Sequence, residues 1–277
     1  MKQGFVKVAS ATPRIRVADP VYNAQVICEQ AKEAAEHGAK IVVFPELCIT
    51  GYTCNDLFLQ ELLLEKAKEA LLTIAEETGQ LETLFLVGLP VDKDGRLYNV
   101  AAVLYRGRIL GMIPKKNIPM YAEFYEGRHF TPGEETVTEY RLGKQVIPFG
   151  SNLLFRCEEL PELILGCELC EDLWVAEPPS TSHALMGATV IANLSASNET
   201  VSKDDYRTLL IKASSARLLC GYIYTSAGEG ESTQDLVFGG HDLIAENGTL
   251  LVQSARFTTG ILYTDLDVLK ISSERRR

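Results

Sequence analysis

Residues 163–174 read LILGCELCEDLW, and the fold and chemistry can be worked out from this stretch. An apolar run of strand-like composition leads to the thiol of Cys170, and two acids and an aromatic residue follow it. A thiol in that place stands at the carboxyl end of a predicted strand, where sheets with parallel strands tend to gather their functional residues. Thiolate is a strong nucleophile when a base or a cation lies nearby. The stretch therefore predicts a site at a strand end, with Cys170 as its nucleophile.

Two other segments repeat this arrangement of an apolar strand followed by a reactive side chain. Residues 41–44 (IVVF) are followed by Pro45 and Glu46, and partial burial of that carboxylate would raise its pKa and suit it to proton transfer. Residues 109–113 are followed by Pro114 and Lys115, whose ammonium could stabilise an oxyanion in a water-poor site. Taken alone, each of these side chains could equally be a solvated loop residue.

The remaining periodicities predict strands that alternate with helices and hairpins, so we expect an α/β fold with a mixed sheet and helices packed on it. Asp56 is expected to cap the second helix. Residues 115–142 show no periodicity and are rich in aromatic residues, which favours a packed functional loop. No linker or repeat is visible, so residues 1–277 are expected to form a single domain. The further predicted strands are 4–9, 84–88, 98–105, 152–156, 162–167, 189–193, 221–225, 236–245, 249–253 and 259–265, and the predicted helices are 18–38, 56–78, 178–187 and 203–219.

The composition restricts the possible partners. The formal net charge is -10 and the sequence pI is about 5.0, which disfavours general binding to nucleic acid or to anionic membranes. The only strong basic run is residues 274–277. No secretory signal and no membrane-spanning window is visible. Seven scattered cysteines argue against a disulfide framework, so a reducing, cytoplasmic location is expected.

The cysteine chemistry has alternatives. Cys167 and Cys170 form a CxxC, which can indicate redox chemistry or half of a zinc site. Zinc needs about four ligands, and no second CxxC or close histidine pair supplies them. In the redox motif the cysteines open a helix, whereas Cys167 is predicted to lie within a strand. A Cys–His dyad also remains open, although no histidine ends an apolar strand; the four are His37, His129, His183 and His241.

The order Glu46, Lys115, Cys170 resembles the Glu–Lys–Cys triad of the nitrilase (carbon–nitrogen hydrolase) superfamily. The CEDLW segment at 170–174 resembles the nucleophile motif of that superfamily and places the catalytic thiol at Cys170, not Cys167. The resemblance implies an αββα sandwich of two mixed sheets with helices outside. It also implies that two copies pack through helices, so a homo-oligomer is expected.

A closer resemblance is to the amino-terminal glutaminase domain of the glutamine-dependent NAD+ synthetase family. It rests on residues 45–58 (PELCITGYTCNDLF), 114–130 (PKKNIPMYAEFYEGRHF), 168–175 (ELCEDLWV) and 192–198 (ANLSASN). It favours Lys115 over Lys116 as the catalytic lysine and implies that Glu126 is a supporting glutamate. Lys203 and Met120 depart from the arginine and asparagine expected there. The residues that the resemblance places around the bound substrate are Tyr121, Glu171, Trp174, Ser197 and Lys203.

The resemblance implies hydrolysis of the side-chain amide of L-glutamine to glutamate and ammonia through a thioester on Cys170. Glu171 would bind the α-ammonium of the substrate, and Lys203 its α-carboxylate. The ammonia would pass to a synthetase domain that amidates deamido-NAD. No Ser-Gly-Gly-x-Asp-Ser phosphate loop occurs in the sequence, so we expect that ATP-using domain to be absent from this chain.

No cofactor is expected in this part, since ATP and magnesium belong to the synthetase domain. One alternative is a stand-alone amidase or nitrilase acting on another small amide. The other is a non-catalytic binding protein with a nitrilase-like fold.

Overall fold

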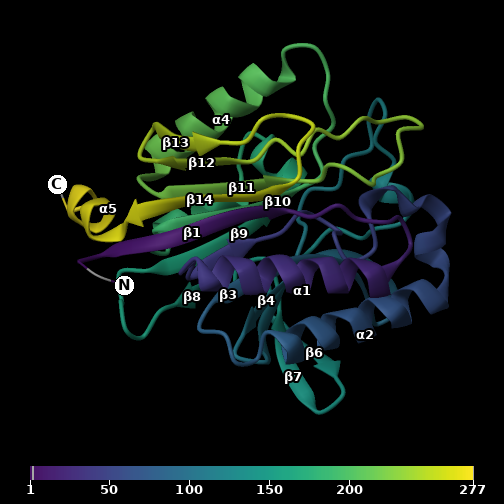
Figure 1. The fold of residues 1–277 in the computed structure, drawn as a ribbon. Coiled ribbons are helices and arrows are strands. Elements are labelled where there is room, and N and C mark those ends of the chain that lie inside the picture. Colours follow the sequence, from purple (N-terminus) through teal and green to yellow (C-terminus); the bar gives the residue numbers. More distant parts are fainter. Residues whose placement is uncertain (2, 277) are drawn as a thin grey trace.

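The computed structural model describes residues 1 and 3–276 and contains two β-sheets that pack face to face (Figure 1). The eight-stranded sheet has the order β14-β1-β2-β3-β4-β5-β7-β6, and the six-stranded sheet has the order β13-β12-β11-β10-β9-β8. Both are mixed, because β1, β2 and β3 run parallel, as do β9, β10 and β11, while most other neighbours are antiparallel. The strands are β1 (Phe5–Thr12), β2 (Ile41–Val43), β3 (Leu84–Lys93), β4 (Arg96–Tyr105), β5 (Arg108–Pro114), β6 (Thr138–Leu142), β7 (Gln145–Phe149), β8 (Phe155–Arg156), β9 (Ile164–Leu169), β10 (Val190–Ser195), β11 (Gly221–Ser226), β12 (Leu243–Glu246), β13 (Thr249–Gln253) and β14 (Gly260–Asp267).

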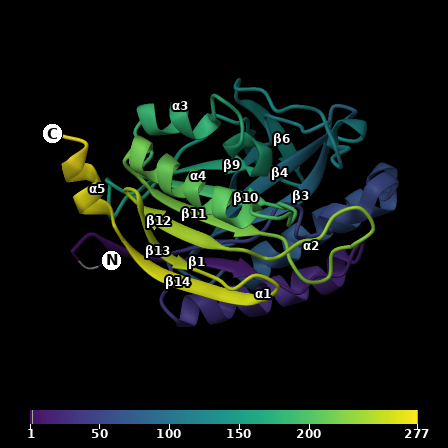
Figure 2. The same ribbon diagram turned by 90° about the horizontal axis from the view of Figure 1, so that it is seen from above.

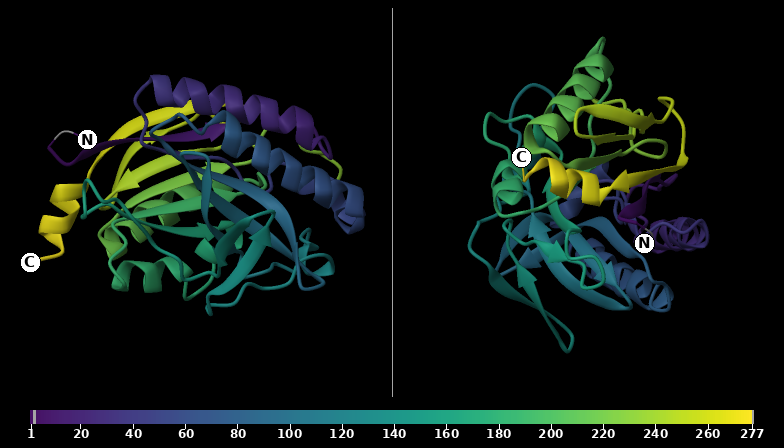
Figure 3. Two further views of the ribbon diagram at one scale, coloured as in Figure 1. Left: turned by 90° about the horizontal axis from the view of Figure 1, so that it is seen from below. Right: turned by 90° about the vertical axis from the view of Figure 1, so that its left-hand side faces the viewer.

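Helices cover the outer face of each sheet. Helices α1 (Pro20–Glu36) and α2 (Glu61–Glu77) lie on the eight-stranded sheet, and Figure 3 shows them side by side on that face. Helices α3 (Pro179–Leu185) and α4 (Lys203–Leu218) lie on the six-stranded sheet, where Figure 2 shows them above β9 to β12. The layers are therefore helix, sheet, sheet, helix, which confirms the αββα sandwich.

Alternation along the strands gives each sheet two apolar faces. In β1, Val8 faces the other sheet and Ala9 faces the helices. In β3, Leu86 faces the other sheet and Phe85 faces α1 and α2. The core side of α1 is rich in alanine, which lets that helix approach the sheet closely. This two-faced burial explains why the central strands are apolar at nearly every position.

The carboxyl ends of the parallel strands from both sheets meet at one edge. There the backbone N–H of Glu46, which follows β2, donates to the carbonyl of Ser195 at the end of β10, 3.3 Å away. The Thr225 hydroxyl near the end of β11 donates to the carbonyl of Val43, 3.1 Å away. Polar contacts thus join the sheets at this edge, while the interior between them is apolar.

Several predicted elements differ in the structure. Residues 138–142 are not loop but form the strand β6, which pairs with the unpredicted β7. The hairpin near the C-terminus is shorter than predicted, because its first strand begins at Leu243 rather than at residue 236. An unpredicted helix, α5 (Val268–Glu274), follows β14.

Asp56 does not cap a long helix as expected. It lies inside the 3-10 helix η1 (Tyr52–Leu59), and α2 begins separately at Glu61. The Asp56 carboxylate instead accepts hydrogen bonds from the side chains of Arg128 and His129. It thereby ties η1 to the segment that follows β5.

The end of helix α5 is tied to the end of α4 and to the segment before β10 by Arg275, which donates to the carbonyls of Ala188, Leu218 and Leu219. Arg277, the last residue of the basic run, lies outside the described residues. Among the residues that are described, no helix has both the length and the apolar character needed to cross a bilayer.

Candidate active site

Glu46, Lys115 and Glu126 form a buried ion cluster. The Lys115 Nζ lies 2.7 Å from Glu46 Oε1, and 2.6 and 2.8 Å from the two carboxylate oxygens of Glu126. Lys115 and Glu46 are fully buried, and Glu126 is 5% exposed. Buried charges are tolerated only when they are paired and hydrogen-bonded, and here one ammonium is shared by two carboxylates. The carboxylates hold the pKa of Lys115 well above its usual value, so the lysine stays charged.

Asn99, on β4, orients the first of these carboxylates. Its Nδ2 donates to Glu46 Oε1 over 2.6 Å, so that oxygen already has two donors. The other oxygen, Oε2, is buried and finds no hydrogen-bond partner among the described residues. Glu46 is thus held by one oxygen and keeps the second free to receive a proton.

Cys170 follows β9 directly and opens the short 3-10 helix η3 (Cys170–Leu173). Its backbone φ is +38°, an unfavourable conformation for a residue with a side chain. Its N–H donates to Asn193 Oδ1 over 3.2 Å, and Asn193 is itself held by Ser195 and Tyr222. This sharp turn directly follows β9, and Cys170 lines a pocket there.

The thiol lies within the electrostatic field of the ion cluster. Burial raises the pKa of Cys170 well above its ordinary range, and the Glu46 carboxylate raises it further. The Lys115 ammonium and the backbone of Ala196 act in the opposite direction. The net effect of these surroundings favours the protonated form of the thiol.

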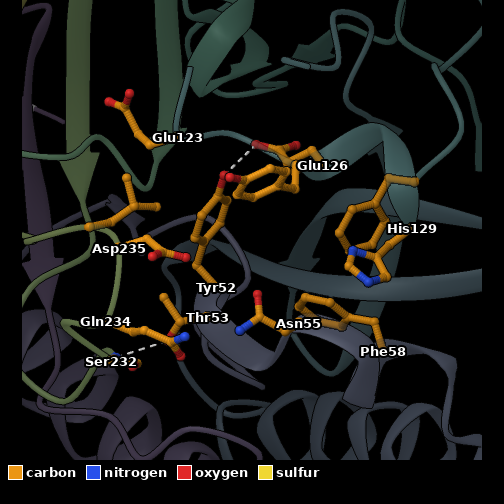
Figure 4. Close-up of a pocket in the computed structure, with 13 residues that line it drawn as sticks. Tyr52, Thr53, Asn55, Phe58, Glu123, Glu126, His129, Ser232, Gln234 and Asp235 are labelled. Carbon is orange, nitrogen blue, oxygen red and sulfur yellow. Dashed lines mark hydrogen bonds between the residues drawn. The ribbon is translucent and has the colours of Figure 1, made fainter. Parts of the chain in front are cut away.

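Tyr52, on η1, also contacts Glu126, at the same carboxylate oxygen that accepts from Lys115. Its hydroxyl donates to Glu126 Oε1 over 2.8 Å, and Figure 4 shows it pointing toward that carboxylate. The backbone N–H groups of Tyr52 and Thr53 are held in turn by the buried carboxylate of Glu231. A small cavity of about 50 Å³ lies beside this contact, lined in part by Tyr52, Glu126 and His129 (Figure 4).

Cys170 opens onto a larger pocket of about 390 Å³. All five residues expected to surround a substrate line it, together with Glu126. Those five are Tyr121, Glu171, Trp174, Ser197 and Lys203. Glu46 and Lys115 are fully buried, and Lys115 contacts Glu126, which does line the pocket.

The pocket carries opposite charges on separate side chains. The Tyr121 hydroxyl donates to both oxygens of Glu171, at 3.1 and 3.0 Å. The Lys203 Nζ lies 5.3 Å from the centre of the Trp174 ring and 5.6 Å from that of Phe124, and it donates to Asn198 Oδ1. Burial raises the pKa of Glu171 and lowers that of Lys203, so both gain from a partner of opposite charge. A small zwitterion would supply both partners.

The structure separates the two cysteines of the CxxC. Cys167 is buried in the core between the sheets, whereas Cys170 lines the pocket. Of the four histidines, none lines the Cys170 pocket; His183 lies on α3, buried, with its Nε2 beside the carbonyl of Ser151. Within residues 1 and 3–276, no group of three or more metal-binding side chains is placed to hold an ion.

Several site residues were not predicted. Asn99 stands inside an ordinary apolar strand, and only the place of β4 near β2 in the same sheet brings it to Glu46. Asn193 and Asp172 lie within the stretches quoted above, but nothing local distinguished them from their neighbours. Arg207, fully buried in α4, donates to Ser197 Oγ and to the carbonyl of Asn198 and so supports the pocket wall.

Comparison with known proteins agrees with this geometry. The sequence model of the carbon–nitrogen hydrolase family matches residues 7–276. A glutamine-dependent NAD(+) synthetase of Mycobacterium bovis is 42% identical over 278 residues, which cover 100% of this chain and 41% of the relative. The chain thus spans about two fifths of the length of the curated relatives it matches.

Solved structures show the same fold. The crystal structure of a glutamine-dependent NAD(+) synthetase from Cytophaga hutchinsonii superposes with a TM-score of 0.86 at 28% identity, covering 95% of this chain and 43% of that one. An amidase from Nesterenkonia sp. superposes with a TM-score of 0.74 at 21% identity, covering 100% of this chain and 97% of the amidase. From the match over residues 7–276 and the buried Glu–Lys cluster beside a strand-end cysteine, we conclude that the chain belongs to the carbon–nitrogen hydrolase family.

Proposed function

We propose that this chain hydrolyses the side-chain amide of L-glutamine to glutamate and ammonia. The observation that carries the proposal is the position of Cys170, which lines a pocket and lies in the electrostatic field of a buried Glu46–Lys115 pair. The pocket offers Glu171 to an α-ammonium and Lys203 to an α-carboxylate, which favours an amino-acid amide over a simple amide.

In the first half of the proposed reaction, Glu46 Oε2 accepts the thiol proton while the sulfur attacks the amide carbon. The carbonyl electron pair moves to oxygen, and the Lys115 ammonium stabilises that oxyanion; one such donor is worth about 3–4 kcal/mol. The tetrahedral intermediate then collapses, its C–N bond breaks, and the nitrogen leaves as ammonia with the proton that Glu46 returns. The product is a thioester on Cys170.

In the second half, Glu46 takes a proton from water as the water oxygen attacks the thioester carbon. Lys115 again stabilises the oxyanion. Collapse breaks the C–S bond, releases glutamate and returns the proton to the sulfur. The side chains of Glu46, Lys115 and Cys170 complete every step, so we propose that this domain works without a metal or cofactor.

The context of the reaction is also a proposal. Two of the relatives above are named glutamine-dependent NAD(+) synthetases, and this chain matches only part of their length. We propose that ammonia passes to an ATP-using synthetase domain of a longer protein, which gives the whole a ligase activity. Seven free cysteines support a cytoplasmic location. Exposed Leu185, Met186, Tyr206 and Leu209 on and beside α3 and α4 support a homo-oligomer.

The test is glutamate release from glutamine, compared with release of ammonia from acetamide and butyramide, with Cys170→Ala as the control. We expect glutamine to be preferred and Cys170→Ala to be inactive. A glutamine-mimicking diazoketone should form its adduct on Cys170. Preference for a simple amide would favour the stand-alone amidase, and an adduct on Cys167 would contradict the assigned nucleophile.

A further inference from the structure

Cys170 and Lys115 reach the site from different sheets, and no strand pairing sets the distance between them. Cys170 follows β9 in the six-stranded sheet, and Lys115 follows β5 in the eight-stranded sheet. In the proposed reaction the thiol must reach the carbonyl carbon of the substrate while the ammonium contacts the carbonyl oxygen. This leaves little tolerance in the distance between the thiol and the ammonium.

The Asp172 carboxylate bridges the two segments. Its Oδ2 accepts from the backbone N–H of Leu169 at 3.0 Å, directly before the nucleophile. Its Oδ1 accepts from both the backbone N–H and the side-chain Nδ2 of Asn117, each at 2.8 Å. The N–H of Lys116, the residue after Lys115, lies 3.5 Å from Oδ2.

Burial of the Asp172 carboxylate costs free energy of desolvation. Asp172 is 2% exposed, and the hydrogen-bond donors that face it are N–H groups rather than a cation. Burial raises the pKa of Asp172 to about 6, and the nearby Glu168 adds to the effect, whereas Leu169 and Asn117 oppose it. A buried carboxylate of this kind contributes little net stability, so its value lies in the geometry that it imposes.

The backbone next to it is strained. Cys170 has a φ of +38°, and such a conformation persists only where the surroundings hold it from both sides. Asn193 holds the N–H of Cys170 itself, and Asp172 holds that of Leu169. The same carboxylate also holds the segment after Lys115.

We infer that Asp172 is the positioning residue that sets the alignment of the Cys170 thiol with the Lys115 ammonium, by clamping the backbone beside each of them. The inference rests on the proposed function for its chemistry. Loss of the clamp should weaken oxyanion stabilisation more than it weakens the thiol as a nucleophile.

The test uses two probes that do not require glutamine. p-Nitrophenyl acetate acylates Cys170 through an oxyanion and needs both groups aligned, whereas iodoacetamide alkylates the thiol without an oxyanion. Both rate constants are corrected with Cys170→Ala. Asp172→Asn keeps the shape of the side chain but places an NH₂ against one of the N–H groups. We expect acylation to slow by about 10²-fold and alkylation by less than about tenfold.

The matched control is Glu246→Gln. Glu246 is a buried carboxylate that accepts from the backbone N–H of Asp267 at 2.7 Å. It pairs with Gly221, the first residue of β11, and so lies at the end of the sheet away from the site. Loss of this carboxylate should lower the thermal stability of the protein and leave the rate constants of acylation and alkylation unchanged.

The inference would be overturned if the rate constants of acylation and alkylation fell equally in Asp172→Asn. It would also be overturned if they fell no more than in Glu246→Gln. If Asp172→Asn does not fold, Asn117→Ala decides, because it removes one donor and leaves the carboxylate in place. Selective slowing of its acylation supports the clamp, and unchanged acylation refutes it. Failure of wild-type protein to hydrolyse glutamine while it is readily acylated would count against the proposed function alone.

Discussion

At the residue scale, the site depends on how two oxygens of one carboxylate are used. Glu46 Oε1 accepts from Lys115 and Asn99, while Oε2 is buried without a partner among the described residues. Burial and Glu46 itself keep the Cys170 thiol protonated. In the proposed reaction the thiolate would therefore form by proton transfer to Glu46, in contrast to a preformed thiolate.

This arrangement predicts the effect of Glu46→Gln. The glutamine oxygen can keep the contacts with Lys115 and Asn99, but the side chain can no longer accept the thiol proton. We expect glutamine hydrolysis to fall by about 10²–10⁴-fold, the usual contribution of a general base. Steady-state kinetics measure this, and circular dichroism should show an unchanged fold. Activity within a few-fold of wild type would exclude Glu46 as the base.

At the scale of elements, the segment that carries Glu46 lies directly on strand β3. A Cβ placed on Gly88 would come within 2.3 Å of the backbone nitrogen of Leu47 and 2.6 Å of the carbonyl of Pro45. Backbone atoms cannot rotate away, so only glycine allows the Glu46 segment to rest on the sheet. The position of Glu46 is thus set by a residue in another strand.

Gly88→Ala should push this segment outward. We expect a loss of about 1–3 kcal/mol in the free energy of unfolding and a fall in turnover of about 10²-fold. Urea titration and glutamate release measure the two effects. Gly111→Ala in β5 is the control, because its Cβ would meet side-chain atoms of Phe155 and Leu153 instead of backbone. If both variants retain full turnover, the packing argument is wrong.

A second contact between elements joins the two sheets. Asp242 accepts from the hydroxyl of Thr12 at the end of β1, at 3.0 and 2.9 Å, and from the N–H of Ser226 at the end of β11, at 2.9 Å. Burial raises the pKa of Asp242 from 3.8 to about 7. A raised pKa in the folded state means that the fold binds this proton more tightly than the unfolded chain does.

The stabilisation from that proton is complete below about pH 3.8 and is lost as the pH rises through about 7. A shift of this size corresponds to at most about 4 kcal/mol. Asp242→Asn has no proton to lose, so its free energy of unfolding should fall less than that of wild type between pH 4.5 and 7.5. Urea titrations at a series of pH values provide the comparison. Parallel curves for the two proteins would show that Asp242 does not titrate in this window.

At the scale of the whole molecule, the segment between β5 and β6 is the natural place for control by another domain. It carries Lys115, Tyr121 and Glu126, and the only helix within it is the short η2 (Glu126–Arg128). Its position depends on contacts with η1 and η3, such as that of Arg128 with Asp56 and that of Asn117 with Asp172. A partner that shifts these contacts would change the site.

We predict that this chain alone hydrolyses glutamine slowly and makes no NAD+. Ammonia released without a consumer is wasted, so coupling should raise the glutaminase rate only when a synthetase domain holds its own ligands. Glutamate release by this chain should be compared with release by a longer protein that includes the following domain, with and without ATP and deamido-NAD. If this chain alone releases glutamate at the full rate, the coupling is excluded and a stand-alone amidase is favoured.

The sequence by itself determined the local elements and the residues that carry reactive groups. Apolar runs such as residues 41–44 and 189–193, and the helical pattern of 203–219, became β2, β10 and α4 because their side chains match a strand or helix buried on the expected faces. The motifs placed Glu46, Lys115 and Cys170 at three strand ends. Predictions failed where the local pattern was weak, as in the exposed hairpin of β6 and β7. They also failed where long-range contacts engaged a side chain, as for Asp56, which contacts Arg128 and His129 instead of capping a helix.

Only the tertiary structure decided how those residues are held. The free oxygen of Glu46 depends on Asn99, 53 positions away in the sequence, and the contact of Asp172 with Asn117 spans 55 positions. In the sequence, Asn99 and Gly88 look like ordinary residues of apolar strands. Only the folded structure places the Glu46 segment against them. Hydrogen bonds and close packing act over a few ångströms in space, and sequence periodicity reports only which face of an element is buried. The chain therefore indicates which reactive groups could form the site, but not how they are aligned.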